Sequence, residues 1–144
     1  MEAVMIDSFK ILMLIREIHS KSINKIESSL LGSGLTHQQI IVLKFVAHNK
    51  KINISQLCKE MYLSKGTVSG IVNRLEQAGY IKKFKYESDK RNTYIEFSEK
   101  GLKFAKDFRL KIESAFENLF DNLTEEEKED IVKSLILIKE KILM

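Results

Sequence analysis

Proline is absent from all 144 residues of this chain, and glycine occurs only six times. These two residues most often end helices and shape tight turns, so their scarcity favours long helices over a β fold with many turns. A chain of this length buries roughly 70% of its unfolded surface and can form its own core. We therefore expect a mainly α fold and a single domain over residues 1–144.

Positive charge is concentrated in one segment of the chain. Residues 65–91 hold seven basic and three acidic side chains, which gives this segment a net charge of +4. The whole chain also has a net charge of +4, so the remaining residues sum to zero. Phosphate binding predicts such a concentration of charge, whereas general solubility does not.

Apolar residues spaced by three and four predict helices over most of the chain. The first covers roughly residues 4–30 and ends at the glycines that follow it. Ser64 can cap another helix, which Gly79 ends, and a further helix begins after Ser98. Three helices begin at capping boxes, in which two side chains satisfy free backbone N–H groups: Thr36 with Gln39, Asn53 with Gln56, and Thr124 with Glu127.

Between Gly79 and Ser98 the pattern changes to one typical of strands. Residues 80–86 and 94–97 contain aromatic and β-branched side chains, and the polar stretch 87–93 lies between them. We expect a small β-hairpin whose charged tip is residues 87–93. The predicted order is four helices, the hairpin and two more helices.

Residues 53–78 read as two short helices joined by a tight turn, which is a helix-turn-helix. With the hairpin directly after it, this predicts a winged helix over residues 36–98. In its second helix, Val68, Val72 and Leu75 have the spacing of an inner face. The outer face then lacks bulky apolar groups and offers side chains that contact bases and phosphates: Lys65, Gly66, Thr67, Ser69, Gly70, Asn73 and Arg74.

Gly66 and Gly70 lie one turn apart on this outer face. A glycine inside a helix costs about 1 kcal/mol relative to alanine, so two on one face favour a close approach of another molecule to the backbone. The alternative interpretation is that Gly66 is merely near the cap and Gly70 is a tolerated defect.

An acidic residue, Asp89, stands beside Lys90 and Arg91 near the expected tip. It makes sense in a DNA-binding hairpin if it holds a nearby arginine in one rotamer before that arginine enters a minor groove. The alternative is a solvated charged turn.

Two motifs together resemble those of MarR-type transcriptional regulators. The run from Ser64 to Ile81 resembles the family's recognition helix, and Ser88-Asp89-Lys90-Arg91, followed by residues 97–101, resembles its wing. Phe97-Ser98 stands where the family has Leu-Thr, which is a mild departure. The order of helices also matches, so the resemblance covers essentially the whole chain.

The resemblance implies a homodimeric DNA-binding regulator, usually a repressor, that reads a pseudo-palindromic operator. Residues 65–74 would lie in the major groove, Arg91 would reach the minor groove with Asp89 steering it, and Arg74 would contact phosphate or brace the wing. It also implies a small, often aromatic, inducer between the dimer core and the DNA-binding regions. The candidate DNA-binding residues are Ser64, Lys65, Gly66, Thr67, Ser69, Gly70, Asn73, Arg74, Lys83, Lys85, Asp89, Lys90 and Arg91.

The flanks outside the winged helix, residues 1–35 and 99–144, predict a helical dimerisation region. A helix that is apolar on more than one side must bury both sides, and a second copy of the chain is the simplest cover. Four phenylalanines extend the apolar surface after Ser98 beyond one stripe: Phe104, Phe108, Phe116 and Phe120.

Several other classes of function are not expected. Motifs of hydrolases, zinc proteases and P-loop enzymes are absent, so we expect no enzyme and no cofactor. The three histidines and Cys58 form no zinc pattern, and Cys58 is interpreted as a buried structural thiol.

No stretch is apolar enough for a spanning helix or a signal peptide, so no membrane partner is expected, and a single cysteine fits the reducing cytoplasm. The alternative function for the same winged helix is non-specific or architectural DNA binding.

Overall fold

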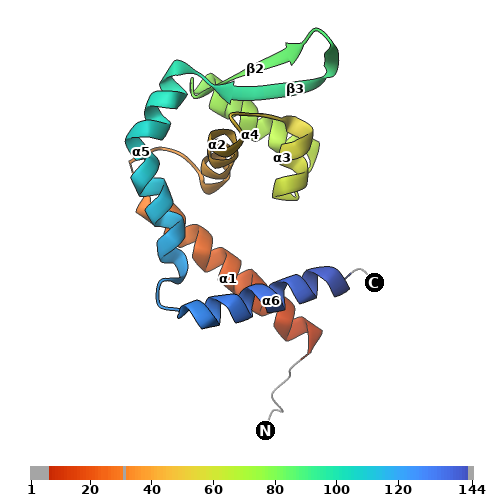
Figure 1. The fold of residues 1–144 in the computed structure, drawn as a ribbon, viewed down its shortest axis with the longest axis vertical. Coiled ribbons are helices and arrows are strands. Elements are labelled where there is room, and N and C mark those ends of the chain that lie inside the picture. Colours follow the sequence, from red (N-terminus) through yellow and green to blue (C-terminus); the bar gives the residue numbers. More distant parts are fainter. Residues whose placement is uncertain (1–6, 31, 143–144) are drawn as a thin grey trace.

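The computed structural model describes residues 7–30 and 32–142 (Figure 1). The prediction of a mainly α fold with a small β-hairpin is confirmed, although the predicted start of the first helix at residues 4–6 lies outside the described residues. The elements are α1 (Ser8–Ser29), α2 (His37–Asn49), β1 (Lys51–Asn53), α3 (Ile54–Met61), α4 (Lys65–Gln77), β2 (Ile81–Tyr86), β3 (Asp89–Phe97), α5 (Glu99–Glu117), the short 3₁₀ helix η1 (Asn118–Phe120) and α6 (Glu125–Lys141).

The winged helix and the terminal helices occupy opposite ends of the molecule (Figure 1). The hairpin β2–β3 lies over α2, α3 and α4, and α5 runs from the end of β3 to the region of α1 and α6. Where α1 packs beside α5 and η1, Lys25 donates from Nζ to the carbonyl oxygen of Asn118 at 2.6 Å. None of the helices within residues 7–30 and 32–142 combines the length and apolar character that a bilayer crossing needs.

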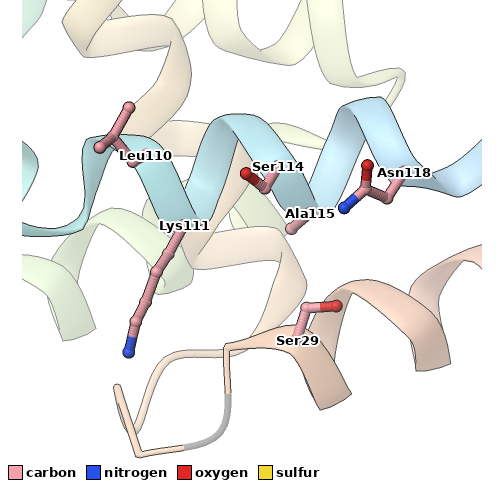
Figure 2. A pocket seen from close by; sticks show the side chains of 6 residues that line it. All are labelled: Ser29, Leu110, Lys111, Ser114, Ala115 and Asn118. Atoms are coloured by element: carbon pink, nitrogen blue, oxygen red, sulfur yellow. The ribbon is translucent and has the colours of Figure 1, made fainter.

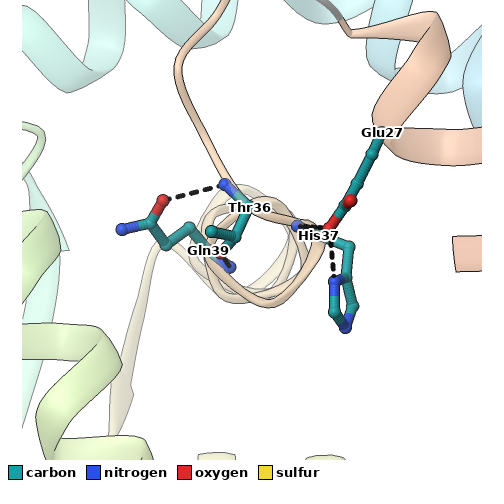
Figure 3. A network of polar contacts seen from close by, with 4 residues as sticks. All are labelled: Glu27, Thr36, His37 and Gln39. Atoms are coloured by element: carbon teal, nitrogen blue, oxygen red, sulfur yellow. Dashed lines mark hydrogen bonds and ion pairs between the residues drawn. The ribbon is translucent and has the colours of Figure 1, made fainter. Parts of the chain in front are cut away.

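Side chains at the predicted helix starts satisfy the first backbone N–H groups. Thr36 Oγ1 accepts from the Gln39 N–H at 3.2 Å, while Gln39 Oε1 accepts from the Thr36 N–H at 2.9 Å (Figure 3). The same reciprocal pair occurs at α3 and α6, and Ser64 and Ser98 cap α4 and α5. These five predicted starts are confirmed because a cap depends only on residues within one turn.

The winged helix contains a strand, β1, that the sequence did not predict. It pairs antiparallel with β3 in a three-stranded sheet of order β1-β3-β2, and Ile52 pairs with Ile95. Both isoleucines are buried in the core. Three residues are too few to show a period of two, so only the neighbouring strand and the core define β1.

The turn of the hairpin is tighter than predicted. Tyr86 at the end of β2 pairs with Asp89 at the start of β3, which leaves only Glu87 and Ser88 for the turn. The expected charged tip is therefore wrong for residues 89–93, which belong to β3. Their polar composition indicates a loop, but β2 supplies backbone hydrogen-bond partners that hold them in a strand.

The inner face of α4 joins the main core of the protein. Val68, Val72 and Leu75 have no exposed surface, as predicted, and Ile71 is buried beside them. Burial of this side fixes which residues of α4 remain on the opposite, solvent side. A smaller core connects α1, α2 and α5 through Ile26, Leu30, Ile40 and Ala115.

The first turn of α5 is anchored against the end of α4. Gly101 is buried, and a Cβ there would overlap the carbonyl oxygen of Tyr80. Ser98 Oγ accepts from the Gly101 N–H at 3.0 Å and donates to the carbonyl oxygen of Gly79. Lys100 Nζ donates to the carbonyl oxygen of Ala78 at 2.7 Å. The positions of α4 and α5 are therefore coupled.

A second contact connects α1 to the start of α2. Glu27 Oε1 accepts from His37 Nδ1 at 2.7 Å and from the His37 backbone N–H at 3.2 Å (Figure 3). These hydrogen bonds hold the pKa of the Glu27 carboxyl below its usual value, and the bond from the His37 ring has the larger effect.

The two terminal helices leave apolar faces exposed. On α1 the exposed residues are Phe9, Ile11, Leu12, Met13, Leu14, Ile15 and Ile18. On α6 and directly after it they are Ile131, Val132, Leu135, Ile136, Leu137 and Ile142. The four phenylalanines expected to extend the apolar surface lie on α5 and η1. Phe120 is exposed, whereas Phe104, Phe108 and Phe116 are half-buried within the chain.

Candidate nucleic-acid interface

The side of α4 opposite the core carries the predicted outer-face residues. Ser64 Oγ accepts from the Thr67 N–H at 3.2 Å, and the two hydroxyl oxygens lie 2.9 Å apart. The positive end of the helix dipole lies at this turn and favours an anion. The exposed residues are Ser64, Lys65, Gly66, Thr67, Asn73 and Arg74, and the half-buried ones are Ser69 and Gly70.

Neither glycine of α4 is required by packing within the chain. A Cβ at Gly66 or at Gly70 would meet no atom of the described residues within 4 Å, so an alanine would fit at both positions. The open space fits the close-approach interpretation, but it also leaves the tolerated-defect alternative open.

The lysines of β2 differ in what holds them. Lys82 Nζ lies 3.7 Å from Glu96 Oε1, whereas Lys85 is exposed and has no ion pair among the described residues. Lys83 Nζ donates to Asn73 Oδ1 at 2.6 Å and lies 3.4 Å from Glu76 Oε1. A position on a strand by itself gives a lysine no fixed donor geometry, but Lys83 has one because α4 places two oxygen acceptors beside β2.

Asp89 contacts the backbone of Arg91 rather than its guanidinium. Its Oδ1 accepts from the Arg91 N–H at 3.2 Å, and its Oδ2 accepts from Asn92 Nδ2 at 2.8 Å. Among the described residues there is no ion pair between Asp89 and Arg91, so the predicted rotamer lock is absent. The carboxylate instead fixes the start of β3, from which the exposed side chains of Lys90 and Arg91 extend.

The wing also carries an aromatic cluster that the sequence reasoning missed. The rings of Phe84, Tyr86 and Tyr94 pack with centroids 4.9 to 5.7 Å apart. Lys51 Nζ lies 5.6 Å from the centroid of the Tyr86 ring, and Tyr86 holds the pKa of Lys51 above its usual value. The aromatic residues were visible in the strand pattern, but Lys51 joins them only because β1 pairs with β3.

A cavity of about 930 Å³ lies between α2 and α5. Lys44 Nζ stands 4.9 Å from the centroid of the Phe116 ring, and Arg109 Nε lies 3.0 Å from Glu113 Oε1. Sequence reasoning named no lining residue, because α3, α4 and the hairpin separate α2 from α5 along the chain. The aromatic and cationic residues that line it are Phe45, Phe97, Phe104, Phe116, Lys44, His48, Lys106 and Arg109.

Two other features give no site of their own. A hollow of about 280 Å³ lies between the end of α1, at Ser29, and the α5 residues Leu110, Lys111, Ser114 and Ala115, with Asn118 just beyond (Figure 2). Cys58, predicted to be buried, is half-buried and packs against the main core. Across residues 7–30 and 32–142, no three His, Cys, Asp or Glu side chains gather in a way that could hold a metal ion.

Comparisons with known proteins agree with this fold. Residues 33–91 match the model of the MarR family. The chain is 33% identical to the transcriptional regulator SarZ of Staphylococcus aureus over 113 residues, which cover 78% of this chain and 75% of SarZ.

Two solved structures share the fold. A mutant MarR from E. coli in complex with operator DNA is similar with a TM-score of 0.75 and 22% identity, over 96% of this chain and 99% of that one. BpsR of Bordetella bronchiseptica, whose DNA binding is regulated by 6-hydroxynicotinic acid, is similar with a TM-score of 0.79 and 18% identity, over 90% of this chain and 98% of BpsR.

The matches to SarZ and to the E. coli MarR complex extend beyond the winged helix, and the relative in S. aureus is a transcriptional regulator. The chain therefore belongs to the MarR family of DNA-binding transcriptional regulators.

Proposed function

We propose that the chain is a homodimeric repressor that reads a pseudo-palindromic operator and is released by a small aromatic ligand. The observation that carries this proposal is the solvent face of α4, which has hydroxyl, amide and cationic side chains and no bulky apolar group. Such groups hydrogen-bond to base edges in the major groove. The similarity to MarR bound to operator DNA supports the same placement of α4.

In this complex the wing contacts the DNA backbone and the minor groove. Lys85, Lys90 and Arg91 are exposed along the hairpin, and Arg74 is exposed on α4. Because Arg74 has no hydrogen bond or ion pair to the wing among the described residues, we assign it to phosphate rather than to bracing. Arg91 would enter a minor groove, where a narrow width favours arginine.

A second copy of the chain would cover the apolar faces of α1 and α6. Phe9 is 67% exposed and Leu137 is 52% exposed, which a folded monomer rarely tolerates over two contiguous faces. Two copies related by a two-fold axis would place two α4 helices in successive major grooves, about one helical turn apart.

The cavity between α2 and α5 is where we place the ligand. Aromatic walls with a few cationic groups suit a flat aromatic acid, whose ring packs on phenylalanine and whose carboxylate meets Lys44 or Arg109. The regulation of BpsR by 6-hydroxynicotinic acid supports a ligand of this class. The cytoplasmic location stays a prediction from the single cysteine.

The test is selection of bound fragments from genomic DNA, followed by affinity for the selected site and for random DNA at one salt concentration. A regulator is expected to bind its site 10³-fold or more tightly than random DNA. Equal affinity for both would favour the alternative, a non-specific or architectural binder. For the ligand, an aromatic acid such as 6-hydroxynicotinic acid should lower operator affinity, and the neutral 6-hydroxy-3-hydroxymethylpyridine serves as the control.

A further inference from the structure

One contact joins the recognition helix to the wing and involves two residues of the interface. Lys83 on β2 donates from Nζ to Asn73 Oδ1 on α4 at 2.6 Å. The same ammonium lies 3.4 Å from Glu76 Oε1, and the Lys83 backbone N–H donates to Glu76 Oε2 at 3.3 Å. Lys83 is thus held along α4 at both its backbone and its side chain.

This contact decides which way the Asn73 amide points. An ammonium can only donate hydrogen bonds, so the amide must turn its carbonyl oxygen toward Lys83. The amide nitrogen then faces away from Lys83, and none of the described residues accepts a hydrogen bond from it. Asn73 itself is exposed on the face of α4 that carries the other candidate base-reading groups.

We propose that the hydrogen bond from Lys83 leaves Asn73 only a donor, Nδ2, to offer to DNA. Asn73 therefore selects guanine over adenine at the base pair that it contacts. The proposal rests on the proposed placement of α4 in the major groove. An asparagine with a free amide edge pairs with adenine by accepting from N6 and donating to N7. Here an ammonium occupies the side of Oδ1, and the adenine N6 donor would meet it donor against donor.

Guanine fits the same arrangement. It presents two acceptors in the major groove, O6 and N7, and no donor on that edge. Asn73 Nδ2 can donate to one of these acceptors, and the Lys83 ammonium beside Oδ1 meets no donor on the guanine edge. Adenine offers Nδ2 only one acceptor, N7, and places its N6 donor next to it.

The exposure of the lysines supports a positioning role for Lys83 over simple phosphate binding. The Lys83 side chain is 32% exposed, compared with 63% for Lys82, and Glu76 offsets its charge. A charge that is already paired contributes less to phosphate binding. Lys85, exposed and without an ion pair among the described residues, is the better phosphate contact and therefore the matched control.

The experiment is selection of bound sequences from a random DNA library, followed by affinities for sites that differ only at the contacted base pair. Wild type is expected to favour guanine over adenine about tenfold at one position of each half-site. Asn73→Ala should erase that preference. Lys83→Met, which keeps the length of the stem and removes the donor, should shift the preference to adenine. Lys85→Met should weaken binding to all DNA sequences by the same factor and leave the preference for guanine unchanged.

Lys83→Arg retains only donors and is expected to keep guanine, which gives a second variant if Lys83→Met fails to fold. A preference that responds to Asn73→Ala but not to Lys83→Met would overturn the proposal and leave the proposed function standing. A wild-type preference for adenine at the Asn73 position would also overturn it. If Asn73→Ala changes the base preference at no position while an operator is still selected, the amide contacts no base. The proposal is then wrong, although the proposed function as a regulator is retained. If no operator is selected at all, the proposed function fails as well.

Discussion

At the scale of single residues, Gly70 separates the needs of folding from those of DNA binding. In the part of the chain that the structure describes, a Cβ there meets nothing within 4 Å, so Gly70→Ala should stabilise the free protein by about 0.5–1 kcal/mol through helix propensity. If DNA approaches the backbone closely, the same methyl group should weaken operator binding. Urea unfolding and operator affinity measure the two effects. Unchanged affinity in a stabilised variant would mean that the glycine is a tolerated defect.

Arg91 and Asp89 at the start of β3 give a second prediction at this scale. Arg91→Ala should cost about 1–3 kcal/mol of operator binding, because a minor-groove arginine is lost. Asp89→Ala should also weaken binding although it removes a negative charge, because the Arg91 N–H and Asn92 lose their acceptor.

Asp89→Asn is the control for Asp89→Ala, since its amide oxygen can still accept from the Arg91 N–H. It should bind DNA better than Asp89→Ala. Tighter binding by Asp89→Ala than by wild type would show that charge alone matters at this position.

At the scale of elements, the close packing of the start of α5 against the end of α4 depends on Gly101. Gly101→Ala places a Cβ against the Tyr80 carbonyl oxygen and 2.9 Å from Phe97 Cδ1, so the backbone must move. We expect a loss of about 1–3 kcal/mol in the free energy of unfolding, the usual cost of overpacking. Urea unfolding measures it, with Gly70→Ala as a glycine substitution of opposite sign. Wild-type stability of Gly101→Ala would contradict this close packing.

The contact between α1 and α2 should respond to pH. Because the His37 hydrogen bonds lower the Glu27 pKa, their contribution to stability is present above the ordinary pKa of a glutamate and is lost as pH falls through the lowered pKa. His37→Ala removes the ring donor and keeps the backbone N–H, so the Glu27 pKa should rise part of the way to its ordinary value. NMR titration of the Glu27 side chain measures this. An identical pKa in wild type and variant would show that the ring does not act on Glu27.

At the scale of the whole molecule, the prediction is dimerisation through the terminal helices. Sedimentation equilibrium at micromolar concentration should give about twice the chain mass of 16.7 kDa. Leu135→Glu should shift the equilibrium to monomer and weaken operator binding, because a charge would be buried in the α6 interface. Lys133→Glu, on the same helix but outside the apolar set, is the control. A folded wild-type monomer under these conditions would contradict the dimer.

Several features of this protein, among them helix starts and the buried face of α4, follow from local chemistry without any tertiary contact. The caps at Thr36, Asn53, Ser64 and Thr124 need only residues within one turn, and the burial of Val68, Val72 and Leu75 follows from helical period alone. The candidate outer face of α4 follows from the same period, because the residues opposite a buried stripe face solvent.

Only the tertiary structure decided the features that join segments far apart in the chain. Strand β1 and the two-residue turn exist because β3 pairs on both sides, and residue composition does not encode such partners. The cavity forms where α2 meets α5, and Lys83 reaches Asn73 only because β2 packs along α4. The sequence indicated Lys83 and Asn73 separately as candidate DNA-binding residues. Their contact, and the orientation that it imposes on the amide, depend on the packing of β2 against α4, because side-chain partners are set by distances in space.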